Sequence, residues 1–433
     1  IETVSELLDA CRQNRLAQTK GFGQKTQEQV LAAIEFNLFN QNKLHWAKAN
    51  KYVNELNEVL LQFLDNSQFA WAGEYYRKAE IVESLELVVI ASAKRSLRIQ
   101  LGNFGISFIQ KEDFFKLLLE DKCTIKVFFD SNIAWKQYQL NTPEEVQKDL
   151  DLKEVAASSE QEVFEANKVS FVLPELREVE NLKWYKSAKE DQLIQYSDLK
   201  GAIHNHTTYS DGLNTLEEMT QACRDQGWEY FGVCDHSQTA SYAGGLKVAE
   251  LEKQWKEIDK LNHKYPDIKV FKGIESDILN DGSLDYEEEI LKQFDFVVAS
   301  VHSNLRMDEE KAMSRLIKAI ENPYTKVLGH LTGRLLLLRE GYPVNHHIII
   351  DACAANGVCI ELNAHPYRLD MDWRYIYQAQ EKGVMISINP DAHVTSGLLD
   401  MQYGVNVARK GGLVKEYCLN SCNLGEFEAW LMK

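Results

Sequence analysis

From residue 198 to the C-terminus, short apolar runs alternate with amphipathic segments that have helical spacing. The seven apolar runs are LKGAIH, YFGVCD, IKVFKGIE, FDFVVASVH, KVLGH, GVCIELN and GVMISIN. Alternation of this kind is typical of βα units around a parallel sheet. We therefore expect residues 198–433 to form an α/β domain whose parallel sheet is either open or closed as a barrel.

Histidines and carboxylates stand at the ends of almost all of these runs. In chain order they are His204, His206, Asp211, His236, Glu275, His302, His330, Asp391 and His393. Because the carboxyl ends of the strands of a βα barrel meet at one rim, these side chains are expected to lie close together. Imidazole nitrogen and carboxylate oxygen together suit zinc, manganese or iron better than calcium or magnesium. The sequence therefore predicts a metal site. The other five histidines lack this placement and are expected to be structural or surface residues: His45, His263, His346, His347 and His365.

The first 197 residues have a different organisation, and we divide them into three segments. Residues 1–63 show helical spacing in VSELLDACRQNRL, EQVLAAIEFNLF and YVNELNEVLLQFL. Residues 64–140 are predicted to form a small α+β domain, in which the β-rich runs 85–91 and 123–129 flank a helix-like stretch at 111–120. Residues 141–197 are acidic and mixed in character, which favours a linker or an irregular connection.

Composition restricts the classes of function. A chain of 433 residues with 45% hydrophobic residues is expected to fold as several domains. Its net charge of −17 argues against general attraction to nucleic acid, so any DNA contact must be local. It has no apolar run of membrane-spanning length and no secretory start, and we expect a soluble, cytoplasmic protein. The eight cysteines are scattered without a CxxC pair and are expected to be buried, reduced thiols.

Six motifs resemble those of the polymerase and histidinol phosphatase (PHP) domain, in the order expected for it. They are HNHTTYSDG, CDHS, GIESDIL, SVHS, GHLTGR and NPDAH. The resemblance implies a distorted (β/α)7 barrel that binds up to three divalent transition metals, namely zinc, manganese or iron. It places the nine residues named above in the family's ligand positions. By resemblance, the first ion takes His204, His206, Glu275 and Asp391, the second takes Glu275, His302 and His330, and the third takes Asp211, His236 and His393.

The stretches between these motifs resemble the PHP domain of bacterial X-family DNA polymerases. They are FVLPELRE, GSLDYEEEIL, GHLTGRLLLLREGYPV and NAHPYRLD. Residues 20–34, KGFGQKTQEQVLAAI, resemble a helix-hairpin-helix, and this implies DNA phosphate contacts at Gly21, Gly23 and Lys25. A plain turn between two helices is the alternative.

The polymerase motif of that family is degenerate in this sequence. Ser84 and Glu86 stand where the resemblance places two aspartates, and the third position falls near Thr124. Glu74 replaces a serine in the turn that should hold a triphosphate, and this puts like charges together. Two magnesium ions need several carboxylates. We therefore expect a palm-like domain without polymerase activity, with unrelated α+β structure as the alternative.

The sequence leads to phosphoester hydrolysis as the expected reaction. The leading hypothesis, implied by the resemblance, is a 3′-5′ exonuclease or end-processing phosphatase in DNA repair, acting on single-stranded, nicked or gapped ends. A small-molecule phosphatase resembling histidinol phosphatase and a non-catalytic DNA-binding scaffold are the alternatives. Arg334, Arg339 and Arg368 are candidates for phosphate binding, with structural ion pairing an equal possibility. Asp235 either orients a metal ligand or begins a helix.

Overall fold

The computed structural model describes residues 1–103, 106–118 and 123–433. These residues form two compact units. Unit 1 comprises Ile1–Leu140, Glu154–Val163 and Leu335–Glu340, and unit 2 comprises Asn141–Lys153, Phe164–Arg334 and Gly341–Lys433. The division into four consecutive segments that the sequence suggests stays a prediction.

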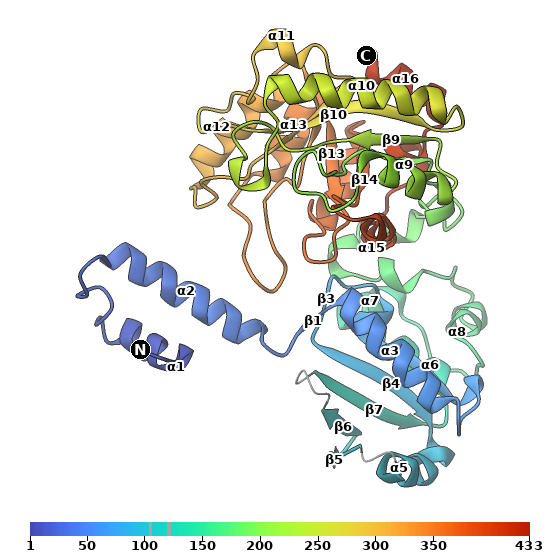
Figure 1. Cartoon of the computed structure of the whole chain (residues 1–433). Coiled ribbons are helices and arrows are strands. Elements are labelled where there is room, and N and C mark those ends of the chain that lie inside the picture. The colour runs from blue at the N-terminus through green and yellow to red at the C-terminus, as the bar shows by residue number, and fades with distance from the viewer. Residues whose placement is uncertain (104–105, 119–122) are drawn as a thin grey trace. The chain divides into compact units, whose positions relative to one another are not determined.

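Unit 1 is built around a five-stranded sheet (Figure 1). Its strands, in spatial order, are β2 (Phe69–Ala72), β4 (Ser84–Ile90), β7 (Thr124–Asp130), β6 (Phe114–Leu118) and β5 (Phe108–Gln110). Strands β4 and β7 are parallel, and the other neighbours are antiparallel. A separate pair joins β1 (Leu44–His45) to β3 (Ile81–Val82). The helices are α1 (Val4–Arg12), α2 (Gln24–Asn40), α3 (Trp46–Leu60), α4 (Gly73–Tyr76), α5 (Lys94–Asn103) and α6 (Ile133–Leu140).

The expectation of a helix over 111–120 is wrong. Residues 114–118 form β6, which pairs with β7 along its whole length. Phe115 and Leu117 are buried while their neighbours are not, which is the two-residue period of a strand. A short apolar run does not distinguish helix from strand by itself, and pairing with β7 decides it here. Residues 119 and 120 lie outside the described part of the chain.

Residues 13–23 form the loop that joins α1 to α2. Gly21 has a φ of 94°, a conformation that glycine adopts readily. The buried side chain of Gln27 accepts a hydrogen bond from the backbone of Ala17 (2.9 Å) and donates one to Asn14 Oδ1 (2.7 Å). Gly23 is the N-cap of α2, so the first turn of this helix begins without a side-chain cap. The turn has a fixed shape, and its identity as a helix-hairpin-helix stays a prediction.

Unit 2 contains seven parallel strands in sequential order, which confirms the seven predicted runs. They are β8 (Gly201–Ala202), β9 (Tyr230–Val233), β10 (Lys269–Asp277), β11 (Phe296–Ser300), β12 (Thr325–Leu328), β13 (Cys359–Asn363) and β14 (Ile386–Asn389). Beyond the two end strands, the backbone N–H of His206 donates to Ala392 O (2.9 Å) and that of Asp391 to His204 O (3.1 Å). These bonds nearly close the sheet into a barrel at its carboxyl end.

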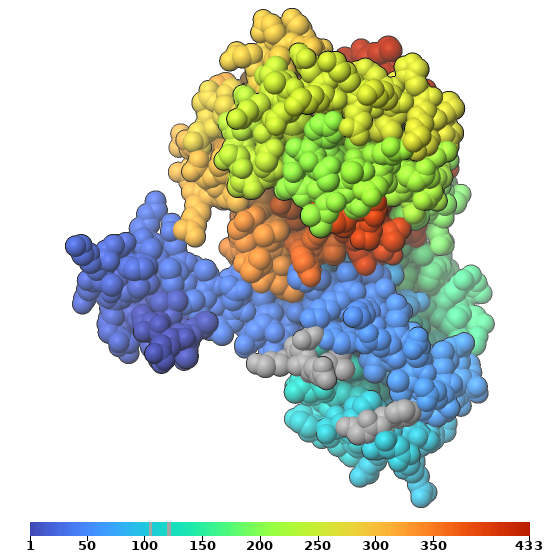
Figure 2. Space-filling model, in the orientation of Figure 1, coloured from blue at the N-terminus to red at the C-terminus, as the bar shows by residue number. Residues whose placement is uncertain are grey.

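Helices cover the barrel and one of them fills its amino end. The helices of this part are α9 (Leu216–Asp225), α10 (Val248–Lys264), α11 (Glu288–Leu291), α12 (Glu309–Ile320), α13 (His346–Asn356), α14 (Ile376–Glu381), α15 (Met401–Lys410) and α16 (Leu424–Leu431). Helices α9 and α10 form much of the visible surface of unit 2 (Figure 2). Phe427 of α16 is fully buried and stacks on Tyr230, with ring centroids 4.5 Å apart. An apolar plug therefore occupies the interior below the polar rim.

The segment 141–197 contains α7 (Glu144–Leu150), α8 (Glu160–Ala166) and several 3₁₀ turns. Its side chains include fully buried Arg177 and Tyr185, so parts of this segment belong to the core of unit 2. All eight cysteines are free thiols, seven of them buried, as the sequence predicts. Among the described residues, every helix is too short or too polar to cross a membrane.

Candidate metal centre

The nine predicted ligands come from the carboxyl ends of six strands of unit 2. His204, His206 and Asp211 follow β8, and His236 follows β9. Glu275 lies near the end of β10, while His302 and His330 follow β11 and β12. Asp391 and His393 follow β14. Because the strands are parallel and neighbouring, their ends deliver these side chains to one rim, as βα topology requires.

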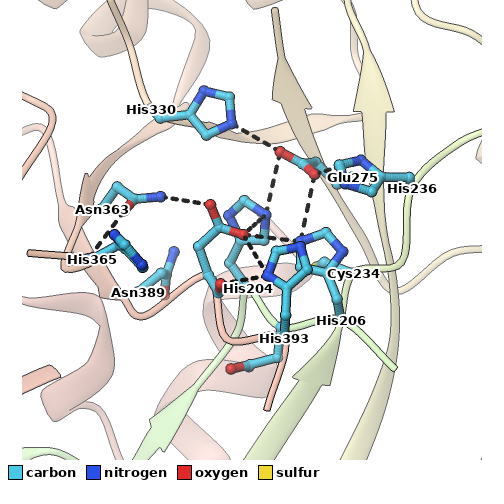
Figure 3. A network of polar contacts seen from close by, with 12 residues as sticks. His204, His206, Cys234, His236, Glu275, His330, Asn363, His365, Asn389 and His393 are labelled. Carbon is cyan, nitrogen blue, oxygen red and sulfur yellow. Dashed lines mark hydrogen bonds and ion pairs between the residues drawn. The ribbon is translucent and has the colours of Figure 1, made fainter. Parts of the chain in front are cut away.

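Glu275 is the centre of this arrangement (Figure 3). Its carboxylate is 1% exposed, and five imidazoles lie within 3.6 Å of it. The nitrogen–oxygen distances are 3.3 Å to His204, 3.6 Å to His206, 2.9 Å to His236, and 3.1 Å to both His302 and His330. A buried carboxylate that several imidazoles face on both of its oxygens offers, together with them, the donor types that divalent transition metals prefer.

The remaining carboxylates extend the cluster on either side. Asp391 Oδ1 lies 3.0 Å from His206 Nε2 and 3.8 Å from His204 Nε2. Asp211 Oδ1 lies 3.3 Å from His393 Nε2, and its other oxygen lies 3.7 Å from His236 Nε2. Three groups of potential ligand atoms result, each within 4.8 Å: His206, Asp211, His236 and His393; His204, His206 and Asp391; His236, Glu275 and His302. Eight of the nine predicted ligands belong to these groups, and the ninth, His330, touches Glu275.

Several polar atoms in this cluster have no hydrogen-bond partner within the described residues. They are His204 Nε2, His206 Nδ1, His236 Nδ1, His330 Nδ1 and Glu275 Oε2. His236 Nδ1 and Glu275 Oε2 lie 2.9 Å apart, but they are not in hydrogen-bonding geometry. A buried polar atom without a partner costs free energy, and such atoms are rare in proteins unless something else satisfies them. Imidazole nitrogens and a carboxylate oxygen are also the donors that divalent transition metals prefer. The residues present therefore fit a group of such ions.

The electrostatics of the site follow from burying the carboxylates of Glu275 and Asp391 among imidazoles, whereas Asp211 is exposed. Burial acts to lower the pKa of His302, but Glu275 and Asp277 raise it to about 10. The pKa of His204 is shifted in the same direction. Burial acts to lower it, but Glu361, Glu275 and Asp391 raise it well above its usual value. Burial lowers the pKa of His206 to about 4. At neutral pH His204 and His302 thus hold protons that metal ions displace, so metal binding releases protons and weakens as the pH falls.

Two carboxylates that sequence reasoning missed hold the ligand histidines from behind. Glu361 of β13 is fully buried and lies 2.6 Å from His204 Nδ1; it also accepts the backbone N–H of His330 at 3.0 Å. Asp277 of β10 contacts His302 Nδ1. Such contacts fix the tautomer and orientation of metal-binding histidines. The sequence contains a signal for each: Glu361 is a charge inside a buried strand, and Asp277 lies two residues after Glu275 on the same strand.

Asp235 supports the loop that contains Asp211. Its carboxylate accepts hydrogen bonds from the backbone and hydroxyl of Thr207 (both 2.7 Å), from Ser210 (2.6 Å) and from Gln254 (2.7 Å). Burial raises the pKa of Asp235, while these donors oppose the shift. The expected helix-start role does not fit, because Asp235 caps no helix and acts on the loop. Its orienting role toward the metal ligands stays a proposal.

The three predicted phosphate-binding arginines have different surroundings. Arg368 Nε lies 3.8 Å from Asp391 Oδ2, so its side chain reaches the centre. Arg334 donates to the backbone oxygens of Arg368 and Leu369 and lies 3.7 Å from Asp372, which are structural contacts. Arg339 belongs to unit 1.

The remaining histidines lie outside the groups of potential metal ligands, counted over the described residues. His263 at the end of α10 contacts the Asp259 carbonyl, and His346 stacks on Tyr375 with centroids 3.9 Å apart. His347 contacts Gln378, and His45 contacts the carbonyl of Leu336. The backbone of His365 donates to Asn363, which in turn donates to Asp391. His365 is thus the one nearest to the centre.

In unit 1, the three positions of the degenerate palm motif lie side by side. Ser84 on β4 pairs with Thr124 on β7, and Glu86 pairs with Lys126. Glu86 is the single carboxylate at these positions, and Lys126 Nζ lies 3.4 Å from it. Glu74 accepts a hydrogen bond from the backbone of Glu83, and burial raises its pKa. The identity of this sheet as a degenerate polymerase palm stays a prediction.

Replacing Glu361 with glutamine is expected to weaken metal binding by about 10- to 100-fold, the usual cost of losing such a supporting carboxylate. The charge that holds His204 Nδ1–H would be lost while the shape of the side chain is kept. Competition with a chromogenic chelator would measure the affinity. Glu381→Gln, at the exposed end of α14, is the matched control and should bind metal like the wild type. Equal affinity of Glu361→Gln and wild type would contradict this expectation.

Comparison with known proteins gives an independent line of evidence. Residues 202–365 match the family model of the PHP domain. The whole chain aligns at 32% identity with the DNA polymerase/3′-5′ exonuclease PolX of Bacillus subtilis and covers 80% of that protein. A probable phosphatase of Thermoanaerobacter is 26% identical over 53% of this chain and 92% of its own length. The crystal structure of histidinol phosphate phosphatase from Lactococcus lactis, complexed with zinc, L-histidinol and phosphate, covers 49% of this chain and 94% of its own, with 17% identity and a TM-score of 0.39.

Proposed function

The chain belongs to the family of the DNA polymerase/3′-5′ exonuclease PolX, and from this premise we propose that it is a metal-dependent phosphoesterase that removes nucleotides from the 3′ ends of DNA. The observation that supports the proposal is the gathering of the nine predicted ligands in one cluster, in which the buried carboxylate of Glu275 faces five imidazoles. Clusters of buried titratable groups with shifted pKa values gather at functional sites, which supports a catalytic role for this cluster.

Up to three divalent ions, zinc, manganese or iron, would be held by the nine residues. His204, His206, Glu275 and Asp391 would hold one, Glu275, His302 and His330 a second, and Asp211, His236 and His393 a third. Ions at such a centre supply an activated water and positive charge for phosphoryl oxygens. Other residues of the chain would orient these ligands. Glu361 holds the proton on Nδ1 of His204, and Asp277 holds the proton on Nδ1 of His302. Asp235 fixes the loop before Asp211.

DNA would be recognised through local contacts, since the chain as a whole is acidic. Arg368, which reaches the centre, is our candidate for a phosphate next to the scissile bond. Gly21 and Gly23 in the turn before α2, with the exposed Lys25 in its first turn, are our candidates for contacts to a more distant phosphate. The substrates would be single-stranded, nicked or gapped DNA ends. Because the proposed contacts are to DNA phosphates, they would give no sequence preference.

A small-molecule phosphatase is the second candidate, and the similarity to a probable phosphatase favours it. That similarity covers about half of this chain, whereas the similarity to the exonuclease extends over unit 1 as well. A metabolite phosphatase would have no use for the additional unit. The third possibility, a non-catalytic scaffold, is disfavoured by a complete set of ligand side chains.

The test is an assay on a 5′-labelled single-stranded oligonucleotide and its nicked and gapped duplexes, with zinc, manganese or iron. We expect stepwise shortening from the 3′ end, and full loss of it after chelation. Histidinol phosphate and p-nitrophenyl phosphate serve as the competing substrates. Intact DNA together with rapid hydrolysis of the phosphomonoesters would establish the second candidate instead.

We expect that the protein does not incorporate nucleotides into DNA. A single glutamate, neutralised by Lys126, cannot hold the two magnesium ions that nucleotidyl transfer needs. A gapped primer–template with all four deoxynucleoside triphosphates and magnesium would measure it. Extension of the primer by the purified protein would show that our interpretation of the palm-like domain is wrong.

A further inference from the structure

Tyr242 is a strongly exposed aromatic residue that lies beside a predicted metal ligand. It belongs to the 3₁₀ turn Ser241–Ala243 in the loop after β9, and it is 71% exposed. Its ring centroid lies 6.2 Å from that of His236, with the two planes inclined by 57°. The ring is therefore at the rim of the metal centre and accessible from outside it.

The loop that carries Tyr242 is firmly anchored. The backbone of Leu246 donates to His236 O (2.9 Å) and that of Gly245 to Ala240 O (3.0 Å). A Cβ at Gly245 would lie 1.9 Å from Ser237 O, so the two arms of the loop are in direct contact. Ala240 and Ala243 on either side of the tyrosine are buried. Tyr242 is thus presented by a rigid support, and little conformational entropy is lost when a ligand packs on its ring.

A second exposed apolar residue stands on the adjoining loop. Leu213, two residues after the predicted ligand Asp211, is 76% exposed, and its backbone donates to His393 O (2.7 Å). The two loops touch, because a Cβ at Gly244 would lie 3.4 Å from Ser210 O. Apolar surface is therefore offered to solvent along the part of the rim formed by Asp211, His236 and His393.

We propose that Tyr242 is a stacking platform for a base next to the scissile phosphate. This inference rests on the proposed function and specifies how the DNA end is held. Every base has a π face, so stacking on an aromatic ring holds single-stranded DNA without sequence preference. A phosphate at the metal centre brings its flanking nucleotides within a few ångströms of the rim. A small phosphomonoester without a base would gain nothing from this ring.

Another rim tyrosine fits this role less well. Tyr367, in the loop after β13, is 53% exposed, but its ring already packs edge-on against His365, with centroids 5.3 Å apart. The ring of Tyr242 contacts its neighbouring histidine at a longer distance and is more exposed. Tyr242 is therefore the residue whose face is available to a base.

The kinetic test compares oligonucleotides that carry a base or an abasic residue at each of the two positions flanking the scissile phosphate. For the wild type we expect removal of one of these bases to lower kcat/KM about tenfold, mainly through KM, as is typical of one stacked base. Tyr242→Ala should have the lowered kcat/KM with both the base-containing and the abasic oligonucleotide. Tyr242→Phe keeps an aromatic ring and should show the same difference in kcat/KM between the two oligonucleotides as the wild type. Tyr417→Ala is the matched control, since Tyr417 precedes Cys418, which pairs with the amino end of β14.

A binding test removes the dependence on hydrolysis. An oligonucleotide with 2-aminopurine at its 3′ end and a hydrolysis-resistant phosphorothioate at the last linkage is mixed with the metal-loaded protein, and quenching of its fluorescence reports stacking. We expect quenching with the wild type, Tyr242→Phe and Tyr417→Ala, and much less with Tyr242→Ala. Equal quenching by Tyr242→Ala, or equal sensitivity of its kinetics to base removal, overturns the inference. If the wild type does not hydrolyse DNA, the proposed function fails, and the quenching experiment still decides whether Tyr242 stacks on bases.

Discussion

Replacing Glu275 with glutamine is expected to lower kcat/KM for DNA hydrolysis by a factor on the order of 10³ or more, because metal-ion catalysis contributes several kcal/mol. Glutamine keeps the shape of the side chain but removes the charge that five imidazoles face. It also puts an N–H₂ group where a ligand oxygen is needed. The centre should therefore lose at least one ion together with its activity.

Metal content after gel filtration, measured by mass spectrometry, and hydrolysis of a labelled oligonucleotide check this expectation together. Glu252→Gln, on the exposed face of α10, is the matched control and should retain both metal and activity. Far-ultraviolet circular dichroism of both variants should match the wild type, because removing a buried charge from a cluster of imidazoles leaves the apolar plug around Phe427 intact. A Glu275→Gln protein with full metal content and normal rates would show that Glu275 is not needed to hold the ions.

The barrel and the meeting of the nine predicted ligands at its rim were predictable from the sequence because two simple regularities coincide there. Buried parallel strands are continuous apolar runs, and all seven are visible as such. A residue at the end of such a run lies at the rim of the barrel, because the carboxyl ends of all the strands meet there. His330 illustrates this: its position at the end of KVLGH was enough to place it beside Glu275, 55 residues away in the chain.

What sequence reasoning missed depends on contacts between distant segments. Glu361 lies in the middle of an apolar run, and its role follows only from its contact with His204, 157 residues earlier. The sequence of β6, FFKLL, shows no alternation of polar and apolar residues, and its alternating burial appears only once it pairs with β7. The irregular segment before the barrel has acidic composition, yet the side chain of Arg177 within it is completely buried. Composition does not reveal which member of a polar segment is enclosed by the fold.

Arg177→Met is expected to lower the free energy of unfolding of unit 2 by about 3 kcal/mol. Nε and Nη2 of Arg177 donate to the carbonyl of Val172 at 2.9 and 2.7 Å, and the guanidinium lies over the ring of Phe164, 4.8 Å from its centroid. Methionine fills a similar volume but offers no donor. A buried carbonyl left without its partner costs about 1–3 kcal/mol, and a desolvated cation–π contact is worth about 2 kcal/mol.

Urea denaturation of the metal-free proteins would measure the loss, since bound ions would otherwise add their own stabilisation. Arg374→Met is the matched control: its guanidinium is 41% exposed, pairs with Glu180 and Asp372 at 3.0 Å, and lies 4.5 Å from the centroid of the Trp373 ring. Exposed ion pairs contribute about 0–1 kcal/mol, so this variant should unfold close to the wild type. The two arginines make similar kinds of contact and differ in burial. If both substitutions shifted the midpoint equally, burial of the guanidinium would not be what makes Arg177 important, and the segment before the barrel would be a covering rather than a part of its core.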